Sequence, residues 1–387
     1  LLKKIIIKHF FILKNNDNFD YKSIDKPIEI QKSLLLFKAI YNLNTDQTLN
    51  KIKKNLYRSI NENGMHNSMN PSMQAEYINN LVEIKNICLF FKINLPLEIN
   101  FQINNMISTL KSLLHKDGSI SLFNGSNNAN IKSIKKIINL KKNIKSKKLH
   151  HINNGLVIFK NKNLKIFLDV VKPTNKLINK NLHSGTLSFE FSYKKEKIIT
   201  NCGSLERRIG RKPEFLRYSA AHSTIVLNNT NISELVYKKS YKRAPKNVVL
   251  ESEENNDELK WLSMHDGYQD NFKKIVKRKI FFSKKTFNIR AEDSIINSKF
   301  FKDDIIYSIR FHLTPICTCV LTQNKKSVLI KTNLDQSFVF KSESKLTLDD
   351  SIYISDGKKI EKTKQIVITG RCKTPKTIIK WFITKLN

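Results

Sequence analysis

The stretch TLSFEFSY at residues 186–193 decides the fold class of the second half of this chain. Its apolar side chains alternate with polar ones, which is the pattern of a β-strand with one buried face. Similar short segments follow to the C-terminus at intervals of roughly 8–12 residues: STIVLN, KIFFS, YSIRFHL, SVLIKT, QIVITG and IIKWFIT. Many short strands joined by polar turns, with no helical segments between them, predict an antiparallel β-sandwich.

The first third of the chain has a helical period instead. Two series of apolar residues recur at steps of three and four, which places each series on one face of a helix. The first series is Tyr77, Leu81, Ile84 and Cys88, and the second is Ile103, Met106, Leu110 and Leu113. Residues 28–43 are also helix-like, and Pro96 and Asp117-Gly118 separate the segments. Successive paired helices predict a bundle or an α/α toroid.

A lysine-rich run, KSIKKIINLKKNIKSKK at residues 132–148, lies between the two patterns. We interpret it as a solvated helix face or linker, because a nucleic-acid strip more often interleaves arginine and aromatic residues. The sequence therefore predicts a helical domain over residues 1–130, a basic linker over 131–152 and a β-sandwich domain over 153–387.

The charge balance is strongly basic. The 387 residues include 69 Lys+Arg against 33 Asp+Glu, a formal net charge of +36. A polyanionic partner such as nucleic acid, anionic lipid or acidic polysaccharide is one explanation. We prefer a general compositional bias, because Lys, Asn and Ile are abundant in both halves. A basic surface favours anionic ligands in either case.

Several other classes of protein are disfavoured. The five cysteines are widely spaced, which argues against a disulfide framework, and Cys317-Thr-Cys319 has no second pair at zinc spacing. No apolar run is long enough for a membrane helix. The start, LLKKIIIKHFFIL, shows no cleavable export signal. Because it begins with Leu rather than Met, we interpret the chain as a fragment or processed product.

Four polar segments stand out in the order NGMHNSMNPS (63–72), DGSISLFNG (117–125), HSGTLSFE (183–190, followed by NCG at 201–203) and RYSAAHST (217–224). Together they resemble the heparinase II/III-like family of bacterial polysaccharide lyases. That family's C-terminal domain begins with a His-rich turn and an L-S-F-E-type strand, followed by a D-x-G-type turn and an A-A-H-S-T-type strand. The resemblance spans roughly residues 50–385. It implies an N-terminal α/α toroid, whole or partial, followed by an antiparallel β-sandwich.

The activity implied by this resemblance is β-elimination on a uronic-acid polysaccharide. The hydrogen next to the carboxylate is weakly acidic, so the enzyme must neutralise the carboxylate and stabilise the enolate-like intermediate. It also needs a base for that hydrogen and an acid for the departing glycosidic oxygen. Histidine and tyrosine suit these roles. The resemblance thus implies an acidic polysaccharide partner, no nucleic acid, and a location in the periplasm or cell envelope.

Carried over by position, the resemblance predicts catalytic roles for His183 and His222. The family's catalytic tyrosine falls on Met73, so Tyr218 or Tyr77 is a candidate substitute, and we select Tyr218. Alternative interpretations are that His183 caps a turn and that His222 is a hydrogen-bonded core histidine. His265-Asp266 before Gly267 indicates a turn.

Substrate contacts are predicted for His66, Asn70, Asn201 and Arg217. His66 and Asn70 also fit the alternative of a helix cap, since Asn-Pro-Ser is a natural helix entry. Arg217 suits a carboxylate, or else belongs to a surface loop.

Two departures from the family pattern bear on metal binding. The first histidine of the His-x-His turn is Asn181, and the aspartate of the D-x-G turn is Asn201. Relatives with a zinc ion hold it with His, Asp and His, whereas an amide is a poor zinc ligand. We therefore predict neither metal nor cofactor. The departures at Met73 and Asn201 also motivate a second hypothesis, a non-catalytic glycan-binding protein of the same fold.

Overall fold

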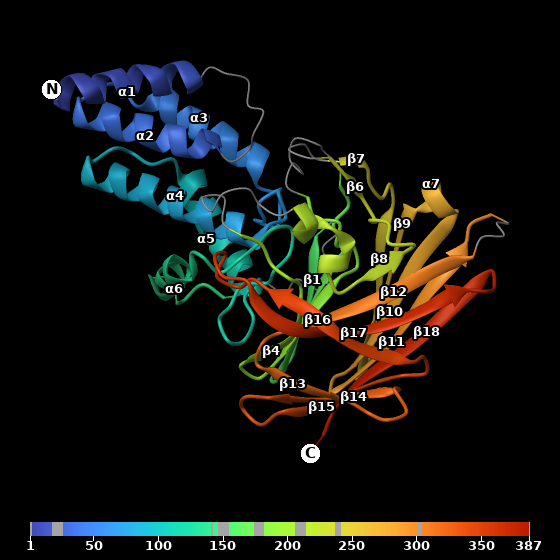
Figure 1. The fold of residues 1–387 in the computed structure, drawn as a ribbon. Coiled ribbons are helices and arrows are strands. Elements are labelled where there is room, and N and C mark those ends of the chain that lie inside the picture. Colours follow the sequence, from blue (N-terminus) through green and yellow to red (C-terminus); the bar gives the residue numbers. More distant parts are fainter. Residues whose placement is uncertain are drawn as a thin grey trace. The chain divides into compact units, whose positions relative to one another are not determined.

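The computed structural model describes residues 2–17, 26–140, 142–145, 155–173, 182–205, 214–236, 241–299 and 304–386. These residues form two compact units (Figure 1). The helical unit contains Leu1–Leu113 and Asn130–Lys147, and the sandwich unit contains Leu114–Ala129 and Lys148–Asn387. Residues 114–129 thus group with the sandwich and residues 130–147 with the helices, which differs from the boundaries expected from the sequence.

The helical unit contains α1 (Leu2–Asp17), α2 (Lys26–Ile40), α3 (Asp46–Ser59), α4 (Pro71–Phe90), α5 (Leu97–Ser112) and α6 (Ile131–Leu140). Helix α4 packs against α2 and α5. The two apolar series identified in the sequence are buried on α4, on α5 and at Leu113 just after it. In α6, Ile134 and Ile137 are buried while the lysines of its outer face are exposed, so part of the lysine-rich run is a solvated helix face. Among the described residues, no helix has the length and hydropathy needed to cross a bilayer.

The sandwich unit is built from two eight-stranded antiparallel sheets. The first has the order β1-β2-β3-β4-β12-β17-β16, with β5 paired to β12. Its strands are β1 (Leu156–Lys160), β2 (Leu164–Asp169), β3 (Phe189–Tyr193), β4 (Glu196–Thr200), β5 (Ile225–Leu227), β12 (Ile305–Leu313), β16 (Leu346–Tyr353) and β17 (Glu361–Cys372). Two short 3-10 helices, η1 (Glu214–Arg217) and η2 (Ser219–Ala221), precede β5.

The second sheet has the order β13-β14-β15-β18-β11-β10-β9-β8. Its strands are β8 (Val248–Glu254), β9 (Glu258–Tyr268), β10 (Lys274–Ser283), β11 (Asn288–Asn297), β13 (Cys317–Leu321), β14 (Ser327–Thr332), β15 (Ser337–Ser342) and β18 (Lys376–Lys385). A separate ribbon pairs β6 (Glu234–Leu235) with β7 (Tyr241–Arg243), and α7 (Gln269–Phe272) follows β9. His265 and Asp266 lie within β9, so the predicted turn at that position was wrong; the chain turns at α7 instead.

Aromatic side chains fill the space between the two sheets. Phe189 of β3 stacks on Trp381 of β18 with ring centroids 5.4 Å apart, and Phe311 of β12 meets the same indole edge-on at 4.9 Å. Phe191 belongs to the same core cluster. The apolar face of the TLSFEFSY strand therefore packs against the opposite sheet, as its alternation predicted.

The polar face of β3 is also buried, which the alternation did not predict. Glu190 and Ser192 are inaccessible to solvent. The reason is that His115, from the 114–129 segment, lies against this face and contacts both side chains. A polar strand face here means a buried hydrogen-bond network rather than exposure to water.

Candidate functional site

The structure brings together the two histidines that the sequence singled out. His183 lies in the turn before β3, and His222 directly follows η2. His183 Nδ1 is 3.3 Å from His222 Nε2, and the two ring planes are nearly perpendicular at 88°. Both side chains are largely buried, with residue exposures of 7% and 2%. Two imidazoles 39 positions apart in sequence therefore form one pair.

The tautomer of His222 follows from its neighbours. Its Nδ1 lies 2.8 Å from the carbonyl oxygen of Tyr218, which can only accept, so Nδ1 donates. Burial lowers the pKa of His222 to about 4, so the ring is neutral near pH 7 and its Nε2 has a lone pair. The hydrogen bond between the rings then runs from His183 Nδ1 to His222 Nε2. Within this pair, His183 is therefore the hydrogen-bond donor and His222 the acceptor.

Ser184 and Ser219, which we call the serine bridge, join the two histidine-bearing turns. The Ser219 hydroxyl donates to the Ser184 carbonyl oxygen at 2.7 Å, and the Ser184 hydroxyl lies 2.8 Å from Ser219 Oγ. The amide of Ser184 also donates to the carbonyl oxygen of Arg217 at 2.8 Å. Both serines are fully buried. The relative position of the two turns is therefore fixed by hydrogen bonds that water cannot replace.

Gly185 provides the space for the His222 ring. A Cβ atom placed on Gly185 would lie 2.6 Å from Cδ2 and 2.9 Å from Cγ of that ring. Such distances are shorter than van der Waals contact, so any side chain at this position would displace the imidazole. The glycine is required here by packing rather than by backbone conformation.

Arg278, on β10 of the opposite sheet, forms hydrogen bonds with both turns. Its guanidinium forms a buried bidentate pair with Asp293 at 2.7 and 3.0 Å. Its Nη1 donates to the carbonyl oxygens of Leu187 at 2.7 Å and Ser223 at 3.0 Å, which belong to the two histidine-bearing turns. A buried guanidinium with these partners is a strong constraint, because removing one partner leaves an unpaired charge in the core.

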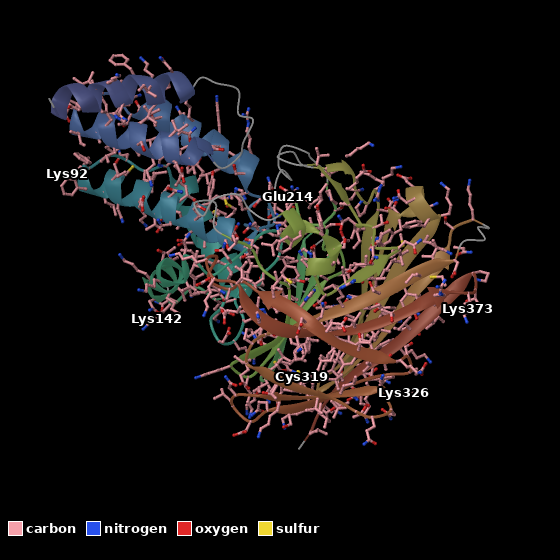
Figure 2. The ribbon with its side chains drawn as sticks, in the orientation of Figure 1. Lys92, Lys142, Glu214, Cys319, Lys326 and Lys373 are labelled. Atoms are coloured by element: carbon pink, nitrogen blue, oxygen red, sulfur yellow. The ribbon has the colours of Figure 1, made fainter. Side chains whose placement is uncertain are left out.

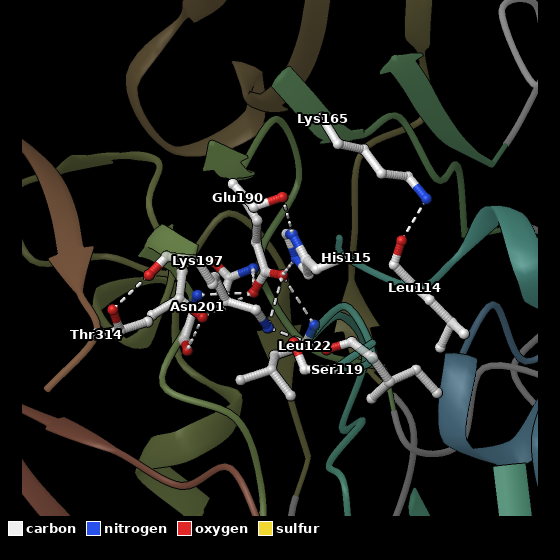
Figure 3. Close-up of polar contacts among 12 residues, drawn as sticks. Leu114, His115, Ser119, Leu122, Lys165, Glu190, Lys197, Asn201 and Thr314 are labelled. Atoms are coloured by element: carbon white, nitrogen blue, oxygen red, sulfur yellow. Dashed lines mark hydrogen bonds and ion pairs between the residues drawn. The ribbon is translucent and has the colours of Figure 1, made fainter. Parts of the chain in front are cut away.

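A second buried network surrounds Glu190 on β3 (Figure 3). The carboxylate accepts hydrogen bonds from His115 Nε2 at 2.9 Å and from the amide of Leu122 at 3.1 Å. Lys197 Nζ lies 3.6 Å away and also donates to the carbonyl oxygen of Ile120. Burial raises the pKa of Glu190, but the Lys197 charge and the hydrogen bonds outweigh it and bring the pKa to about 2. The ionised carboxylate thus attaches the 114–129 segment to the sheet.

Asn201, for which we predicted a substrate contact, belongs to this network and is fully buried. Its backbone amide donates to Glu190 Oε1 at 2.9 Å, and its side-chain Nδ2 lies 3.4 Å from the same oxygen. Its Oδ1 accepts from the amide of Ser223 at 3.0 Å, next to His222. The amide side chain therefore connects Glu190 to the histidine pair. An aspartate here would place a second negative charge beside Glu190.

Tyr218 and Arg217 belong to the turn that begins at Glu214, the residue of this turn that Figure 2 labels. Tyr218 is 41% exposed, and its carbonyl oxygen orients His222. The Arg217 side chain is only 13% exposed. Its Nε donates to the carbonyl oxygen of Leu182 at 3.1 Å and its Nη1 pairs with Glu214 at 3.0 Å. Tyr218 is thus accessible to a ligand, whereas Arg217 also stabilises the turn.

The remaining predicted residues, His66 and Asn70, belong to the helical unit. Asn70 caps α4, since its Oδ1 accepts from the amides of Ser72 at 2.8 Å and Met73 at 3.1 Å. His66 is buried, with its Nδ1 2.8 Å from Ser68 Oγ and its ring 5.2 Å from that of Tyr77. Tyr77 itself is 1% exposed, which makes it a packing residue. Asn181 lies outside the described residues.

Four contributors to the site were missed from the sequence: His115, Glu190, the serine bridge and Arg278. Glu190 gave a signal, because a carboxylate inside a strand of otherwise small and apolar residues needs buried partners. The other three gave none, because each acts through contacts between segments distant in sequence.

The residues present do not fit a zinc ion of the kind that the family pattern implies. Zinc sites use at least three protein ligands, and the histidine pair supplies two nitrogens. The third position is Asn201, whose Oδ1 accepts the Ser223 amide instead. Within the described ranges, no three His, Cys, Asp or Glu side chains converge as a metal site requires.

Comparison with solved structures shows the same architecture. A mutant of the heparan sulfate lyase HepC from Pedobacter heparinus matches with a TM-score of 0.72 and 14% identity, over 93% of this chain and 60% of that one. The corresponding HepC structure has a TM-score of 0.69 and 15% identity over the same shares. A heparinase III gene product matches with a TM-score of 0.77 and 11% identity, over 98% of this chain and 62% of that one. At these identities the likeness shows the fold, and the chain spans about 60% of the length of these proteins.

Sequence comparison gives a family match. No curated protein sequence matches the chain. The model of the family described as heparinase II/III-like, C-terminal, matches residues 145–382, which is more than half of the 387 residues. The chain therefore belongs to the heparinase II/III-like family.

Proposed function

We propose that this protein is a polysaccharide lyase that cleaves an acidic, uronic-acid-containing polysaccharide by β-elimination. The observation that carries the proposal is the contact between His183 and His222, in which the neighbours of His222 leave it neutral and fix its tautomer. Family membership and the likeness to heparan sulfate lyase structures support the reaction class. The net charge of +36 supports an anionic substrate.

In the proposed reaction, His183 takes up the proton from C5 of the uronate, and its Nδ1–H stays hydrogen-bonded to His222 Nε2, 3.3 Å away. The electrons of the broken C5–H bond form the C4–C5 double bond as the C4–O4 bond breaks. Tyr218, the exposed member of the site, donates its hydroxyl proton to the departing oxygen. Arg217 lies beside Tyr218 in the chain and is the proposed partner of the substrate carboxylate.

We further propose that the helical unit is a whole or partial α/α toroid that contributes to substrate binding. Two observations support this. Helix α4 packs against both α2 and α5, and the match to a heparinase III structure extends over most of this chain, including its helices. His66 and Asn70 remain proposed substrate contacts of this unit, although both are buried and their described contacts are those of a turn and a helix cap. The predicted separation of a helical domain from a β-sandwich domain is likewise part of this proposal, with the boundaries of the two compact units.

The proposed location is the periplasm or cell envelope. Polysaccharides of this kind are too large to be ordinary cytoplasmic substrates, so a lyase meets them outside the inner membrane. The proposal is tested by fractionating cells that produce the native full-length protein; recovery with the cytoplasmic fraction contradicts it.

The catalytic proposal is tested with a panel of acidic polysaccharides and three single variants. His183→Ala and His222→Gln each remove one member of the pair, and His9→Ala, an exposed histidine on α1, is the matched control. The wild type and the control are expected to release ultraviolet-absorbing unsaturated uronate, and the two site variants to lose at least about 100-fold in kcat/KM. Equal rates in all four proteins would exclude the histidine pair as the catalytic group.

A non-catalytic glycan-binding protein is the alternative, favoured by the full burial of Tyr77 and Asn201. For that function, wild-type protein binds the polysaccharide without releasing unsaturated product, and binding is unchanged in His183→Ala.

A further inference from the structure

The sandwich unit has two exposed aromatic side chains on the turn that leads into His222. Phe215 is 49% exposed and Tyr218 is 41% exposed. Among the described residues of the sandwich unit, these are the aromatic side chains that are exposed to this degree; its other strongly exposed large hydrophobics are aliphatic, for example Val320 and Leu329. In the described part of this unit, the strongly exposed aromatic rings thus lie on the turn that leads into His222.

The two aromatic residues share one turn. They are three positions apart, and the amide of Tyr218 donates to the carbonyl oxygen of Phe215 at 3.1 Å. Side chains three residues apart on a 3-10 turn project on the same side. Leu216, between them, is 3% exposed and packs in a small core cluster with Cys202 and Ile354. Because Leu216 anchors the turn inward, its aromatic neighbours are directed outward.

This turn is also rigid, which a surface loop need not be. Arg217 donates to the carbonyl oxygen of Leu182 and pairs with Glu214, and its own carbonyl oxygen accepts the amide of Ser184. The Tyr218 carbonyl oxygen accepts from His222 Nδ1. The backbone that carries the two rings is therefore held in place relative to the histidine pair before any ligand binds, which limits the entropy lost on binding.

We propose that Phe215 and Tyr218 form a stacking platform for a hexopyranose ring of the polysaccharide, at a subsite adjoining the histidine pair. The axial C–H groups of a pyranose form an apolar face that can cover an aromatic ring, while its hydroxyls remain in water. The phenyl ring of Phe215 has no acid, base or hydrogen-bonding group, so it contributes to the proposed subsite through apolar contact alone. The proposal rests on the proposed function, because it takes the ligand to be the same polysaccharide.

The charge of the protein makes a control for non-specific binding necessary, since a net charge of +36 attracts any polyanion. Binding is measured at fixed ionic strength for two kinds of probe. Heparan sulfate, hyaluronan and alginate present pyranose rings, and inorganic polyphosphate presents charge without rings. A platform acts on the first kind alone.

Phe215→Ala is the test variant, and Leu329→Ala on β14 is the matched control, because it removes an apolar side chain that is 43% exposed. Phe215→Ala is expected to weaken binding of at least one glycan about tenfold, because stacking buries about half of an aromatic ring. Polyphosphate binding by Phe215→Ala is expected to stay unchanged. Leu329→Ala is expected to bind both kinds of probe as the wild type does, and Phe215→Trp is expected to retain glycan binding. Since Phe215 is exposed, the melting temperature of Phe215→Ala is expected to equal that of the wild type.

The platform would be overturned by wild-type glycan affinity in Phe215→Ala, by an equal loss for glycan and polyphosphate, or by no binding of any glycan by the wild type. Failure of the lyase proposal is seen separately. Turnover with an unchanged KM in Phe215→Ala rejects the platform alone. If the wild type releases no unsaturated product and Phe215→Ala loses glycan binding, the platform is supported and the lyase is rejected. Tyr218→Phe, which keeps the ring, is expected to retain binding while losing turnover.

Discussion

Replacing Gly185 with alanine is expected to displace the His222 ring. The added Cβ would lie 2.6 Å from Cδ2, and ordinary van der Waals contact begins at 3.4 Å, so the ring must move by about 0.8 Å (3.4 minus 2.6). The contact between His183 Nδ1 and His222 Nε2 is already 3.3 Å long, so a shift of this size is enough to break it. We expect a destabilisation of about 1–3 kcal/mol from overpacking. Turnover is expected to fall about 100-fold, as for a misplacement of roughly 1 Å.

Urea denaturation and the nitrogen chemical shifts of the imidazoles measure the two consequences separately. The shifts report whether His222 still has its proton on Nδ1, and they do so even in a protein without turnover. The matched control is the same substitution in a His222→Ala background, where no ring opposes the methyl group. There, Gly185→Ala is expected to cost little, so the two substitutions are strongly non-additive. Unchanged His222 shifts and equal costs in both backgrounds would refute the packing argument.

Three further predictions concern the buried network and pH. Glu190→Gln is expected to destabilise the sandwich unit by about 3–5 kcal/mol, because Lys197 loses its buried counter-charge. The urea midpoint of unfolding measures this loss, with Glu343→Gln at an exposed ion pair as the control. Equal midpoints for the two variants would contradict the prediction. Asn201→Asp is expected to lower the free energy of unfolding by about 1–3 kcal/mol, since it replaces a donor 3.4 Å from Glu190 Oε1 with a carboxylate. A melting temperature equal to that of the wild type would show that this contact is unimportant. Burial lowers the pKa values of His115 and His222 to about 4, so the unfolded chain takes up protons first and stability falls as pH drops from about 6.5 towards 4. The slope of the unfolding free energy between about pH 6 and 4.5 should decrease by roughly 1.4 kcal/mol per pH unit in His222→Gln, and an unchanged slope would mean that His222 is protonated when folded.

The periodicities in the sequence were sufficient for the elements and their buried faces. Steps of three and four identified the apolar faces of α4 and α5, and alternation identified the core face of β3. These predictions rely on short-range geometry, which each segment has by itself. The same reasoning failed for the polar face of β3, because Glu190 is covered by a segment about 70 residues earlier in the chain.

The site was predictable in part. The ordered motifs singled out His183 and His222, which the structure brings into contact, and their catalytic role stays a prediction. They could not show that Asn201 forms hydrogen bonds with Glu190 and Ser223, or that Asn70 caps α4. An amide suits a substrate contact and a structural hydrogen bond equally well. Arg278 was beyond the motifs altogether, since it reaches the site from the opposite sheet.

Cleavage of a uronic-acid polysaccharide in water enriched in heavy oxygen is the most direct test of the proposed chemistry. Elimination breaks the C4–O4 bond without adding water, so mass spectrometry should find chain fragments with an unsaturated terminal residue and no incorporated label. Incorporation of one labelled oxygen per cleavage would mean hydrolysis, and the absence of any fragments would mean that the paired imidazoles do not act on these polymers.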